Sequence, residues 1–330
     1  MAEKILVTGG SGFIGTHLIR ALIKHGHEIK SIDIKQSMDQ RHEKIWIDCD
    51  IKDYDRLKRV FDEFRPTRVI HLAARASLTG KTVEDFPDNT IGTKNIVESI
   101  NRSESVALFL NTSTQYVVRP GLFPKDSEYL SPYTAYGESK AEAERIVRVS
   151  CKRPWVIVRP TNIWGPEHPY FPYELWRYLE RRYYVHPGYS PIRKHYGYID
   201  NAVAQIIQIA LSDPPTRVAG KVYYISDPPI DSYEWMNGFS LNLSGKKARR
   251  VPIAIWKLMA LLGSILNLVK IKFPVNLERL FRLTVNETLP NSMIVTIEND
   301  KIVSLSDGIA RCAAWYRHMR ASNSGAQVRQ

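Results

Sequence analysis

The sequence predicts an α/β fold built on a doubly wound parallel sheet. Short runs rich in valine, isoleucine and leucine recur over the first half of the chain, amphipathic stretches separate most of them, and a glycine-rich turn follows the first run directly. Apolar strands that alternate with helices are typical of a parallel sheet covered on both faces. With 330 residues, 44% of them hydrophobic, the chain is long enough for a large core.

The predicted strands follow one another along the first half of the chain. They are the runs KILVTG, IKSIDI, KIWIDC, TRVIHLAA, SVALFLNTS and PWVIVRP. We therefore assign 1–165 to the sheet domain, and we expect strands near 196–201 and 220–226 to rejoin it. The irregular, proline-rich and aromatic segment 166–195, together with 228–330, predicts a smaller, interleaved α/β cap.

The first strand leads into TGGSGFIG, residues 8–15, which opens the first predicted helix. In this pattern Gly9 permits a tight turn, Gly12 lets the backbone approach a pyrophosphate, and Gly15 allows close packing of helix on strand. The exposed amides and the helix dipole then hold the anion. A strand, this loop and a helix in succession predict a dinucleotide-binding Rossmann domain.

An acidic residue supports the same interpretation. Asp33 ends the second predicted strand 18 residues after Gly15, where its carboxylate can accept hydrogen bonds from the adenosine ribose and repel a 2′-phosphate. The sequence therefore favours NAD over NADP, while Lys35 and Arg41 nearby keep NADP open.

The stretch AYGESKAEAER, residues 135–145, sets Tyr136 and Lys140 four positions apart on one side of a predicted helix. Spacing alone does not identify catalytic residues, because Tyr54 and Lys58 have the same spacing. The surrounding motifs have to separate the two pairs.

These motifs occur in the order seen in extended short-chain dehydrogenases/reductases. They are the three glycines spaced by two residues, HLAA (71–74), NTIGTKN (89–95), a serine on the fifth strand, YGESK and RPTNIWGP (159–166). The chain resembles the NAD-dependent epimerase/dehydratase family, in its nucleotide-sugar branch, from residue 3 to the late SLSDGIARCAAWYR.

The resemblance implies an NAD-dependent epimerase, or a related modifying enzyme, that acts on a nucleotide sugar through a transient keto intermediate. It also implies that the cap binds the substrate and that the enzyme is a homodimer. The alternative is an NAD(P)-dependent dehydrogenase/reductase of a sterol-like or other apolar alcohol, of the 3β-hydroxysteroid dehydrogenase type, which shares the same catalytic residues.

The resemblance also assigns three catalytic residues. It makes Tyr136 the acid/base, Lys140 its partner and Ser113 the hydroxyl donor at the end of the fifth strand, with Thr112 as the nearest rival for that role. A free phenol has a pKa near 10. An ammonium one turn away and the positive nicotinamide ring would favour the phenolate and bring Tyr136 toward working pH.

Two departures from the family pattern follow that serine. The usual Val-Tyr-Gly is replaced by Tyr116, Val117 and Val118, so the local backbone geometry is expected to differ. Dehydratases of the family carry an Asp-Glu pair where this chain has Thr114 and Gln115. Without those carboxyls a 4,6-dehydratase lacks its acid and base, which favours epimerisation or simple oxidoreduction.

Matching to the family extends the candidate site. The positions expected to bind substrate are Ser77, Thr114, Asn162 and Arg193, the last because it matches the arginine that pairs with a nucleotide diphosphate. The positions expected to bind the cofactor are Gly9, Gly12, Phe13, Ile14, Gly15, Asp33, Asp50, Ile51, Leu72, Ala73, Ala74, Asn89, Tyr136, Lys140, Pro160 and Thr161.

The formal charge of +12, with a pI near 9.5, fits a phosphorylated substrate, an anionic membrane surface or a solvated basic face. No nucleic-acid motif accompanies it, so no nucleic-acid partner is expected. Cys49, Cys151 and Cys312 lie far apart, and the nine histidines lack ligand spacing, so neither disulfides nor a metal site is expected. The predicted first strand reaches its glycine turn within ten residues, which leaves no room for a secretory signal peptide. We therefore expect a cytoplasmic protein.

Residues 251–271, after the basic run KKARR (246–250), form the most apolar part of the chain. Lys257, Gly263 and Asn267 interrupt the segment. We expect a buried or partner-facing helix of the cap, with peripheral membrane contact through 246–271 as the second possibility and a membrane span as the third.

Overall fold

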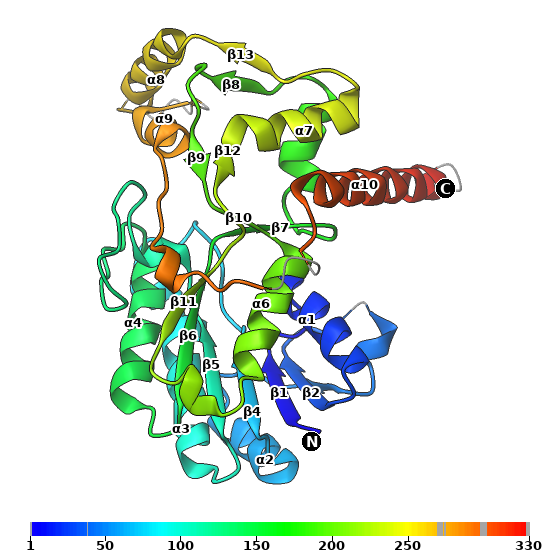
Figure 1. Cartoon of the computed structure of the whole chain (residues 1–330), viewed down its shortest axis with the longest axis vertical. Helices are drawn as coiled ribbons and strands as arrows, with labels where there is room; N and C mark the ends of the chain where they lie inside the picture. The colour runs from blue at the N-terminus through cyan, green and yellow to red at the C-terminus, as the bar shows by residue number, and fades with distance from the viewer. Residues whose placement is uncertain (1, 38, 269–272, 274, 298–301, 328–330) are drawn as a thin grey trace.

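Seven strands form one parallel sheet in the computed structural model, in the order β11-β6-β5-β4-β1-β2-β3 (Figure 1). The structure describes residues 2–37, 39–268, 273, 275–297 and 302–327. The order reverses between β1 and β4, and ligands of such sheets bind beyond the carboxyl ends of the strands at that point. The strands are β1 (Lys4–Thr8), β2 (Glu28–Asp33), β3 (Trp46–Asp48), β4 (Arg68–His71), β5 (Leu108–Thr112), β6 (Trp155–Pro160) and β11 (Val222–Ile225).

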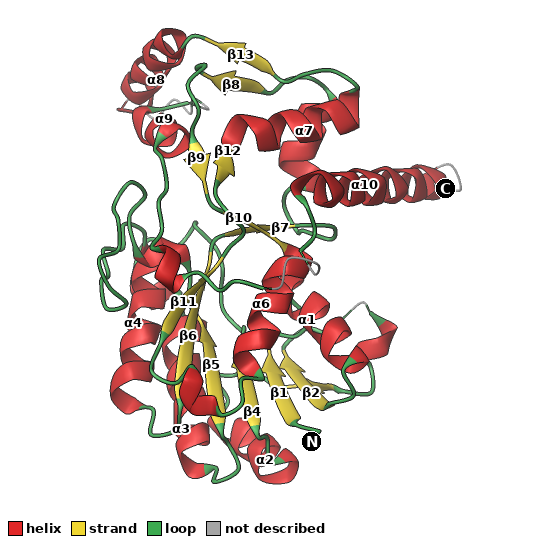
Figure 2. Cartoon of the chain, viewed as in Figure 1, coloured by secondary structure: helices red, strands yellow, loops and turns green. Residues whose placement is uncertain are grey.

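Helices cover both faces of this sheet (Figure 2). Ile5 and Val7 pack into one hydrophobic cluster and Leu6 into another, because successive side chains of a strand point to opposite faces. The first cluster contains residues of α1 (Phe13–Lys24) and α6 (Ile199–Ala210), and the second contains residues of α2 (Tyr54–Phe64), α3 (Thr93–Arg102) and α4 (Ala135–Ser150). The predicted doubly wound sheet is confirmed.

Of the two late strands that were expected to rejoin the sheet, one does and one does not. β11 lies beside β6 in the main sheet, as predicted for 220–226. The strand predicted near 196–201 does not rejoin the sheet. Its first part, β10 (Tyr196–Tyr198), pairs with β7 (Asn162–Trp164), and the remainder begins α6. Since β11 occupies the place beside β6, the earlier segment pairs with the chain just beyond the end of β6.

The remaining elements lie above the carboxyl ends of the sheet (Figure 1). Trp164, Trp235 and Phe239 of this part belong to the same cluster as Ile5 and Val7, so the upper lobe is anchored on one sheet face. The elements are α5 (Arg177–Glu180), α7 (Ser232–Ser244), α8 (Ile253–Leu268), α9 (Leu277–Thr284), α10 (Leu305–Gln327), and the strand pairs β8 (Val185–Pro187) with β13 (Arg249–Val251) and β9 (Arg193–Lys194) with β12 (Ile230–Asp231).

Short helices complete the described chain. Two of them, η3 and η5, are π-helices; η3 immediately precedes α3, at the end of the sheet where ligands bind, and π turns are frequent at functional sites. They are η1 (Gln40–His42), η2 (Val83–Asp85), η3 (Asp88–Gly92), η4 (Gln115–Val117), η5 (Pro172–Trp176), η6 (Pro215–Arg217) and η7 (Asn291–Met293).

Candidate active site

The turn between β1 and α1 is shaped to hold an anion on its backbone. Gly9 has a φ of +72°, in the left-handed region that favours glycine. Gly12 precedes α1 without a side-chain cap, which leaves the first amides of the helix available to a ligand. A Cβ on Gly15 would lie 2.3 Å from the Gly9 carbonyl oxygen, so only glycine allows this packing. These features fit a dinucleotide pyrophosphate.

Asp33 at the end of β2 is held in place by two backbone amides. Its Oδ2 accepts from Ser11 N at 3.0 Å and its Oδ1 accepts from Lys35 N at 3.0 Å. Arg41 is engaged elsewhere, since its Nε and Nη2 donate to Asp39 at 2.9 and 2.6 Å. This guanidinium holds the pKa of Asp39 well below its usual range. With Asp33 fixed and Arg41 paired, this end of the site fits NAD better than NADP.

A cavity of about 1060 Å³ extends from this loop across the carboxyl ends of β1, β2 and β4. Ile14 and Gly15 do not line it, because Ile14 packs against the core and Gly15 packs beneath the loop. The predicted cofactor residues in its wall are Gly9, Gly12, Phe13, Asp33, Asp50, Ile51, Leu72, Ala73 and Ala74.

Several residues of this wall were not predicted from the sequence. Trp315 and Met319 come from α10, and His168 comes from the loop after β7. The His168 ring stacks on Phe171 with centroids 3.9 Å apart and meets Phe13 edge-on at 4.9 Å. Burial lowers the pKa of His168 to about 4, so its ring is neutral at pH 7. No local sequence motif marks Trp315, Met319 or His168, and only the fold brings these three residues to the cavity.

The Asn89 side chain connects two segments of the chain by hydrogen bonds. Its side-chain oxygen accepts from Arg75 N at 2.9 Å, and its amide donates to Ser139 Oγ at 2.9 Å. Ser139 Oγ in turn donates to the Tyr136 carbonyl oxygen at 2.8 Å. Asn89 is fully buried and does not line the cavity, so the structure gives it a role in positioning α4.

Pro160 and Thr161 lie at the end of β6, outside the walls of both cavities described in this section. Thr161 is buried, and its hydroxyl donates to the Ile225 carbonyl oxygen at 3.0 Å. Their predicted contact with the nicotinamide stays a prediction.

Tyr136 lies in the first turn of α4, whose start is fixed by Thr134. The Thr134 hydroxyl accepts from Gly137 N at 3.0 Å, which caps the helix. The Tyr136 ring is half-buried and lies 6.1 Å from the Tyr116 ring and 6.0 Å from the Phe86 ring, measured between centroids. This aromatic setting places the phenol beside the segment 115–118 that departs from the family pattern.

Burial raises the pKa of Tyr136 to about 12, a hydrogen bond from the Thr114 side chain opposes the rise, and Tyr116 adds to it. Lys140 is not among the groups that lower this pKa. The protein's own groups therefore leave Tyr136 protonated at neutral pH, and the expectation that Lys140 together with the nicotinamide ring brings it toward working pH stays a prediction.

Lys140 is buried one turn further along α4, and burial lowers its pKa to about 8 while the Glu144 carboxylate opposes that shift. Glu144 accepts from Arg159 Nε at 2.9 Å and from Arg159 Nη2 at 2.8 Å. Both partners of this pair are fully buried. Burial, with a further effect of Lys140, lowers the pKa of His71 to about 3, which leaves Lys140 beside a neutral imidazole.

The hydroxyls at the end of β5 are arranged differently from the prediction. Ser113 Oγ lies toward Glu144 and makes no hydrogen bond of ordinary geometry with any residue that the structure describes. The Thr112 hydroxyl is likewise unpaired among these residues. The hydroxyl that reaches Tyr136 is that of Thr114. Ser113 as the third catalytic residue stays a prediction.

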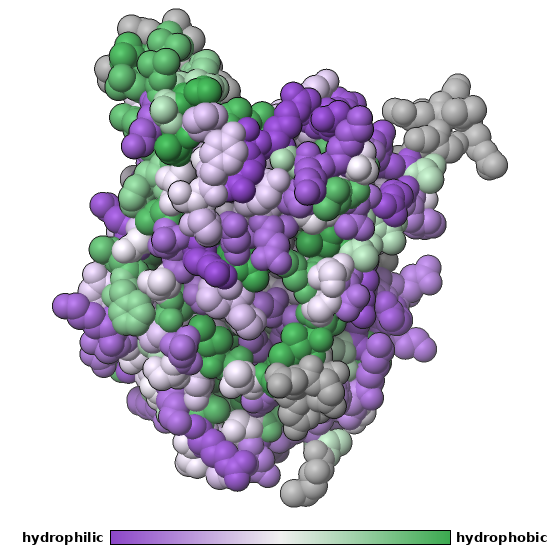
Figure 3. All heavy atoms as spheres, turned by 45° about the horizontal axis from the view of Figure 1, so that its top comes forward, coloured by the Kyte–Doolittle hydropathy of each residue, from purple (hydrophilic) through white to green (hydrophobic). Residues whose placement is uncertain are grey.

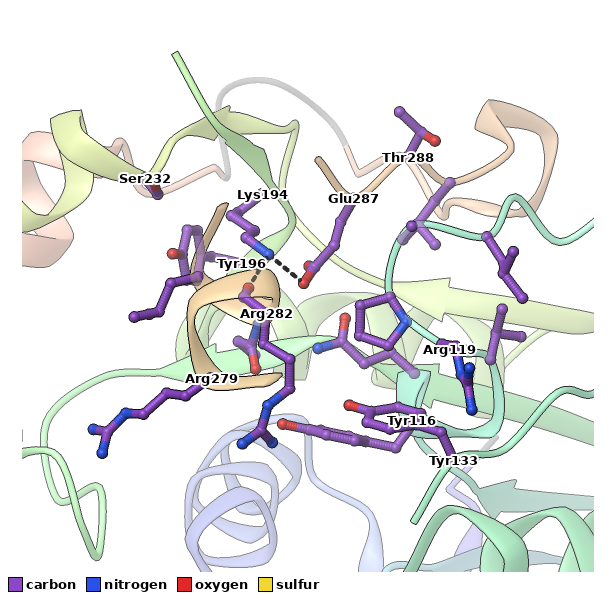
Figure 4. Close-up of a pocket in the computed structure, with 18 of the residues that line it drawn as sticks. Tyr116, Arg119, Tyr133, Lys194, Tyr196, Ser232, Arg279, Arg282, Glu287 and Thr288 are labelled. Carbon is purple, nitrogen blue, oxygen red and sulfur yellow. Dashed lines mark hydrogen bonds and ion pairs between the residues drawn. The ribbon is translucent and has the colours of Figure 1, made fainter. Parts of the chain in front are cut away.

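A second cavity of about 310 Å³ lies between η4, α7 and α9 (Figure 4). Tyr116 and Tyr133 stack on one side with centroids 5.8 Å apart, and the Arg282 side chain points toward them. Within the described part of the chain, Glu287 is the single acidic residue of the wall. The basic residues of the wall, besides His186, are Arg119, Lys194, Arg279 and Arg282.

The predicted substrate residues divide between this cavity and other places. Asn162 lines it, but Arg193 is exposed and does not. Lys194 faces the cavity instead, because neighbouring residues of a strand point to opposite sides. Its Nζ donates to Glu287 Oε1 at 2.8 Å. Ser77 lies outside both cavities.

Two known proteins are similar to this chain in sequence. The 3 beta-hydroxysteroid dehydrogenase/Delta 5-->4-isomerase of Mycobacterium tuberculosis is 29% identical over 249 residues, 70% of this chain and 67% of the relative. The UDP-glucose 4-epimerase of Neisseria meningitidis is 30% identical over 162 residues, 44% of this chain and 47% of the relative.

The fold is shared with the crystal structure of UDP-glucuronic acid 4-epimerase from Bacillus cereus, with a TM-score of 0.69 and 20% identity over 96% of this chain and 99% of that one. The model of the NAD dependent epimerase/dehydratase family matches residues 5–219. This match spans more than half of the chain and includes the glycine loop and the Tyr136 helix. The chain is a member of the NAD dependent epimerase/dehydratase family.

Proposed function

We propose that the protein is an NAD-dependent epimerase, or a related modifying enzyme, that acts on a nucleotide sugar through a transient keto intermediate. The observation that carries this proposal is the second cavity, where stacked tyrosines lie beside arginines on two elements. Aromatic rings suit a nucleobase or a sugar face, and guanidinium groups suit a diphosphate by bidentate geometry. Tyr136 lies beside Tyr116, one of these two tyrosines.

The glycine loop fits the pyrophosphate of NAD, and the Asp33 carboxylate fits its adenosine ribose. When bound, NAD would accept and return a hydride at the sugar carbon. Tyr136 would take the proton of the sugar hydroxyl and give it back, with the Thr114 hydroxyl holding the phenol in place. Since Lys140 does not lower the pKa of Tyr136 in the protein alone, the positive charge of the bound nicotinamide ring would have to favour phenolate over phenol.

The same geometry disfavours water elimination. Dehydratases need a carboxyl acid and a carboxylate base at the positions of Thr114 and Gln115. Here Thr114 caps η4 by accepting from Tyr116 N, and Gln115 lines the second cavity. Neither side chain titrates in the working range, so epimerisation or oxidoreduction remains.

We also propose that residues 1–165 form the NAD-binding domain, and that 166–195 with 228–330 form the substrate-binding cap. The second cavity supports this division, because most of its wall beyond the η4 loop comes from the cap. A cytoplasmic, homodimeric enzyme is proposed from the family resemblance. The three free cysteines, two of them buried, are compatible with a reducing compartment.

A panel of UDP-, GDP- and dTDP-sugars, with sugar stereochemistry and net NADH both followed, tests the proposal. Isomerised sugar without net NADH is the expected result. Tyr136→Phe should lower kcat about 10²–10⁴-fold because it removes the acid/base. The matched control is Tyr54→Phe on α2, outside both cavities, which should retain activity. Full activity of Tyr136→Phe would falsify the assignment.

A second candidate function is oxidation or reduction of an apolar alcohol. Two observations favour it: the relative named as a steroid dehydrogenase matches over more of the chain than the epimerase relative, and α8 exposes a large apolar surface. This enzyme would form NADH in proportion to the alcohol consumed. Steroid-dependent NADH, with no conversion of any sugar, would replace the first proposal by the second.

A further inference from the structure

The helix α8 exposes an unusually apolar surface. Leu258 is 70% exposed, Ile265 is 53% exposed, and five more large apolar residues of this helix are at least 36% exposed. In Figure 3 their side chains gather in one hydrophobic region at the upper left. The exposed apolar residues of α8 are Ile253, Ile255, Leu258, Met259, Leu261, Leu262 and Ile265.

The orientation of α8 is fixed by the small residues on its other side. Ala260 is fully buried against Val275 and Leu280. A Cβ on Gly263 would lie 1.9 Å from the Val275 carbonyl oxygen, so this side of the helix is pressed against the segment that leads into α9. A surface helix of a globular protein normally turns its apolar stripe inward. Here the large apolar side chains face outward.

Positive charge surrounds this helix in the sequence. Residues 235–277 contain no aspartate or glutamate and seven lysines and arginines. Among the described ones, Lys246, Lys247, Arg249 and Lys257 are exposed. Arg249 lies in β13, which leads directly into α8, and Lys257 lies on α8 itself. These cations lie on α8 and along the chain that leads into it, and we call them the basic border of the apolar surface; the acidic residue nearest to α8 in the sequence is Glu278, in the first turn of α9.

This charge pattern decides which partner fits the surface. A symmetric dimer through α8 would set the basic border of one copy against the same border of the other, and like charges facing each other destabilise an interface. An anionic bilayer offers acyl chains to the apolar residues and negative headgroups to the cations. None of the helices in the described chain is both long and apolar enough to cross a bilayer.

We propose that the protein docks on anionic membrane surfaces through α8, which lies in the plane of the interface with its apolar face among the upper acyl chains. α9 packs directly on α8 and contributes Arg279 and Arg282 to the second cavity. Docking therefore places that cavity next to the lipid surface. This inference is independent of the substrate, because it rests on α8 and the cations near it and not on either cavity.

Flotation of the full-length protein with lipid vesicles tests this proposal. We expect binding to vesicles of phosphatidylglycerol and phosphatidylcholine, at least about tenfold weaker binding to phosphatidylcholine alone, and release of most protein between about 0.1 M and about 0.5 M salt. Leu258→Glu with Leu262→Glu should weaken binding at least about tenfold. Val149→Glu is the matched control, because Val149 is 86% exposed on α4 and should not contact lipid.

The electrostatic part has its own matched pair. Lys246→Glu with Lys247→Glu should weaken binding to anionic vesicles, while Lys44→Glu with Lys221→Glu, an equal change of net charge at exposed sites away from α8, should not. Equal effects of the two pairs, equal binding to both vesicle types, or no vesicle binding would each overturn the proposal. A dimer that dissociates in Leu258→Glu with Leu262→Glu, without vesicle binding, would assign the surface to a second copy. Circular dichroism checks that each variant is folded.

Discussion

Removing Arg159 should strongly destabilise the protein, because Arg159 is the main partner of a buried carboxylate. Both side chains of the Glu144–Arg159 pair are fully buried, and two hydrogen bonds join them. Burial alone would raise the pKa of Glu144, but the bonds from Arg159 outweigh burial and hold that pKa below its usual value. In Arg159→Met the carboxylate keeps the contact with Arg148 at 3.3 Å and the neighbouring Ser113 hydroxyl.

The expected loss is about 3–5 kcal/mol of unfolding free energy, the usual cost of leaving one member of a buried pair uncompensated. That is a large fraction of a typical total of about 5–15 kcal/mol. Arg159→Met with Glu144→Leu should recover most of this loss and lie within about 1–2 kcal/mol of the parent protein, because two apolar side chains replace both charges.

Urea unfolding of the four proteins in this cycle, followed by far-UV circular dichroism, measures the coupling between the two sites. Our reasoning predicts a double variant more stable than either single variant. Additive losses, or a cost below about 1 kcal/mol for Arg159→Met alone, would show that the pair is solvated or relaxes easily and would refute it.

The same pair is linked to catalysis through Lys140. Burial lowers the pKa of Lys140 to about 8, and the Glu144 charge opposes this shift. Glu144→Gln should therefore lower that pKa further. Since the ammonium is lost as pH rises through its pKa, the alkaline limb of the kcat profile should move to lower pH. An unmoved limb in a folded variant would separate Glu144 from the chemistry.

Two more predictions concern the cofactor site, and a third concerns the buried His71. Gly15→Ala should weaken NAD binding about 10–100-fold, as measured by tryptophan quenching, because its Cβ would meet the Gly9 carbonyl at 2.3 Å. Asp39→Ala should free Arg41 and shift the NAD-to-NADP preference about tenfold toward NADP, measured as a ratio of kcat/KM values. His71, whose folded pKa of about 3 lies below its unfolded value, contributes stability that is present above pH 6.5 and is lost as pH falls. His71→Gln should therefore show about 1–2 kcal/mol less loss of stability between about pH 7 and about pH 5 in urea unfolding.

The parts of the site that were predicted from the sequence are those set by local patterns. The strand, glycine loop and helix around Gly9 are adjacent in the chain, and Asp33 closes the next strand, so their positions follow from one βαβ unit. Trp315 and Met319 reach the same cavity from the last helix. No local spacing connects them with the loop, since long-range packing alone brings them there.

The differences between the predicted and the observed side-chain directions on the substrate side come from single-residue uncertainty in very short elements. β9 has two residues, and which of Arg193 and Lys194 faces the cavity depends on the orientation of one pleat. The same limit applies to Ser113 and Thr114, which follow the end of β5, where the backbone leaves the strand for η4. Even a family alignment that is correct at every residue does not determine where these side chains point.

The helix α8 shows a further limit, because apolar periodicity does not say which side of a helix meets the protein. The sequence favoured a buried or partner-facing helix, yet the side that packs on α9 carries Ala260 and Gly263. Small residues allow close approach of two backbones, and this close packing turns Leu258 and Leu262 toward the surroundings. The complete lack of acidic residues over 235–277 is the better sequence signal, because a helix solvated by water alone does not require it. An anionic surface explains both the outward apolar face and the one-signed charge around it.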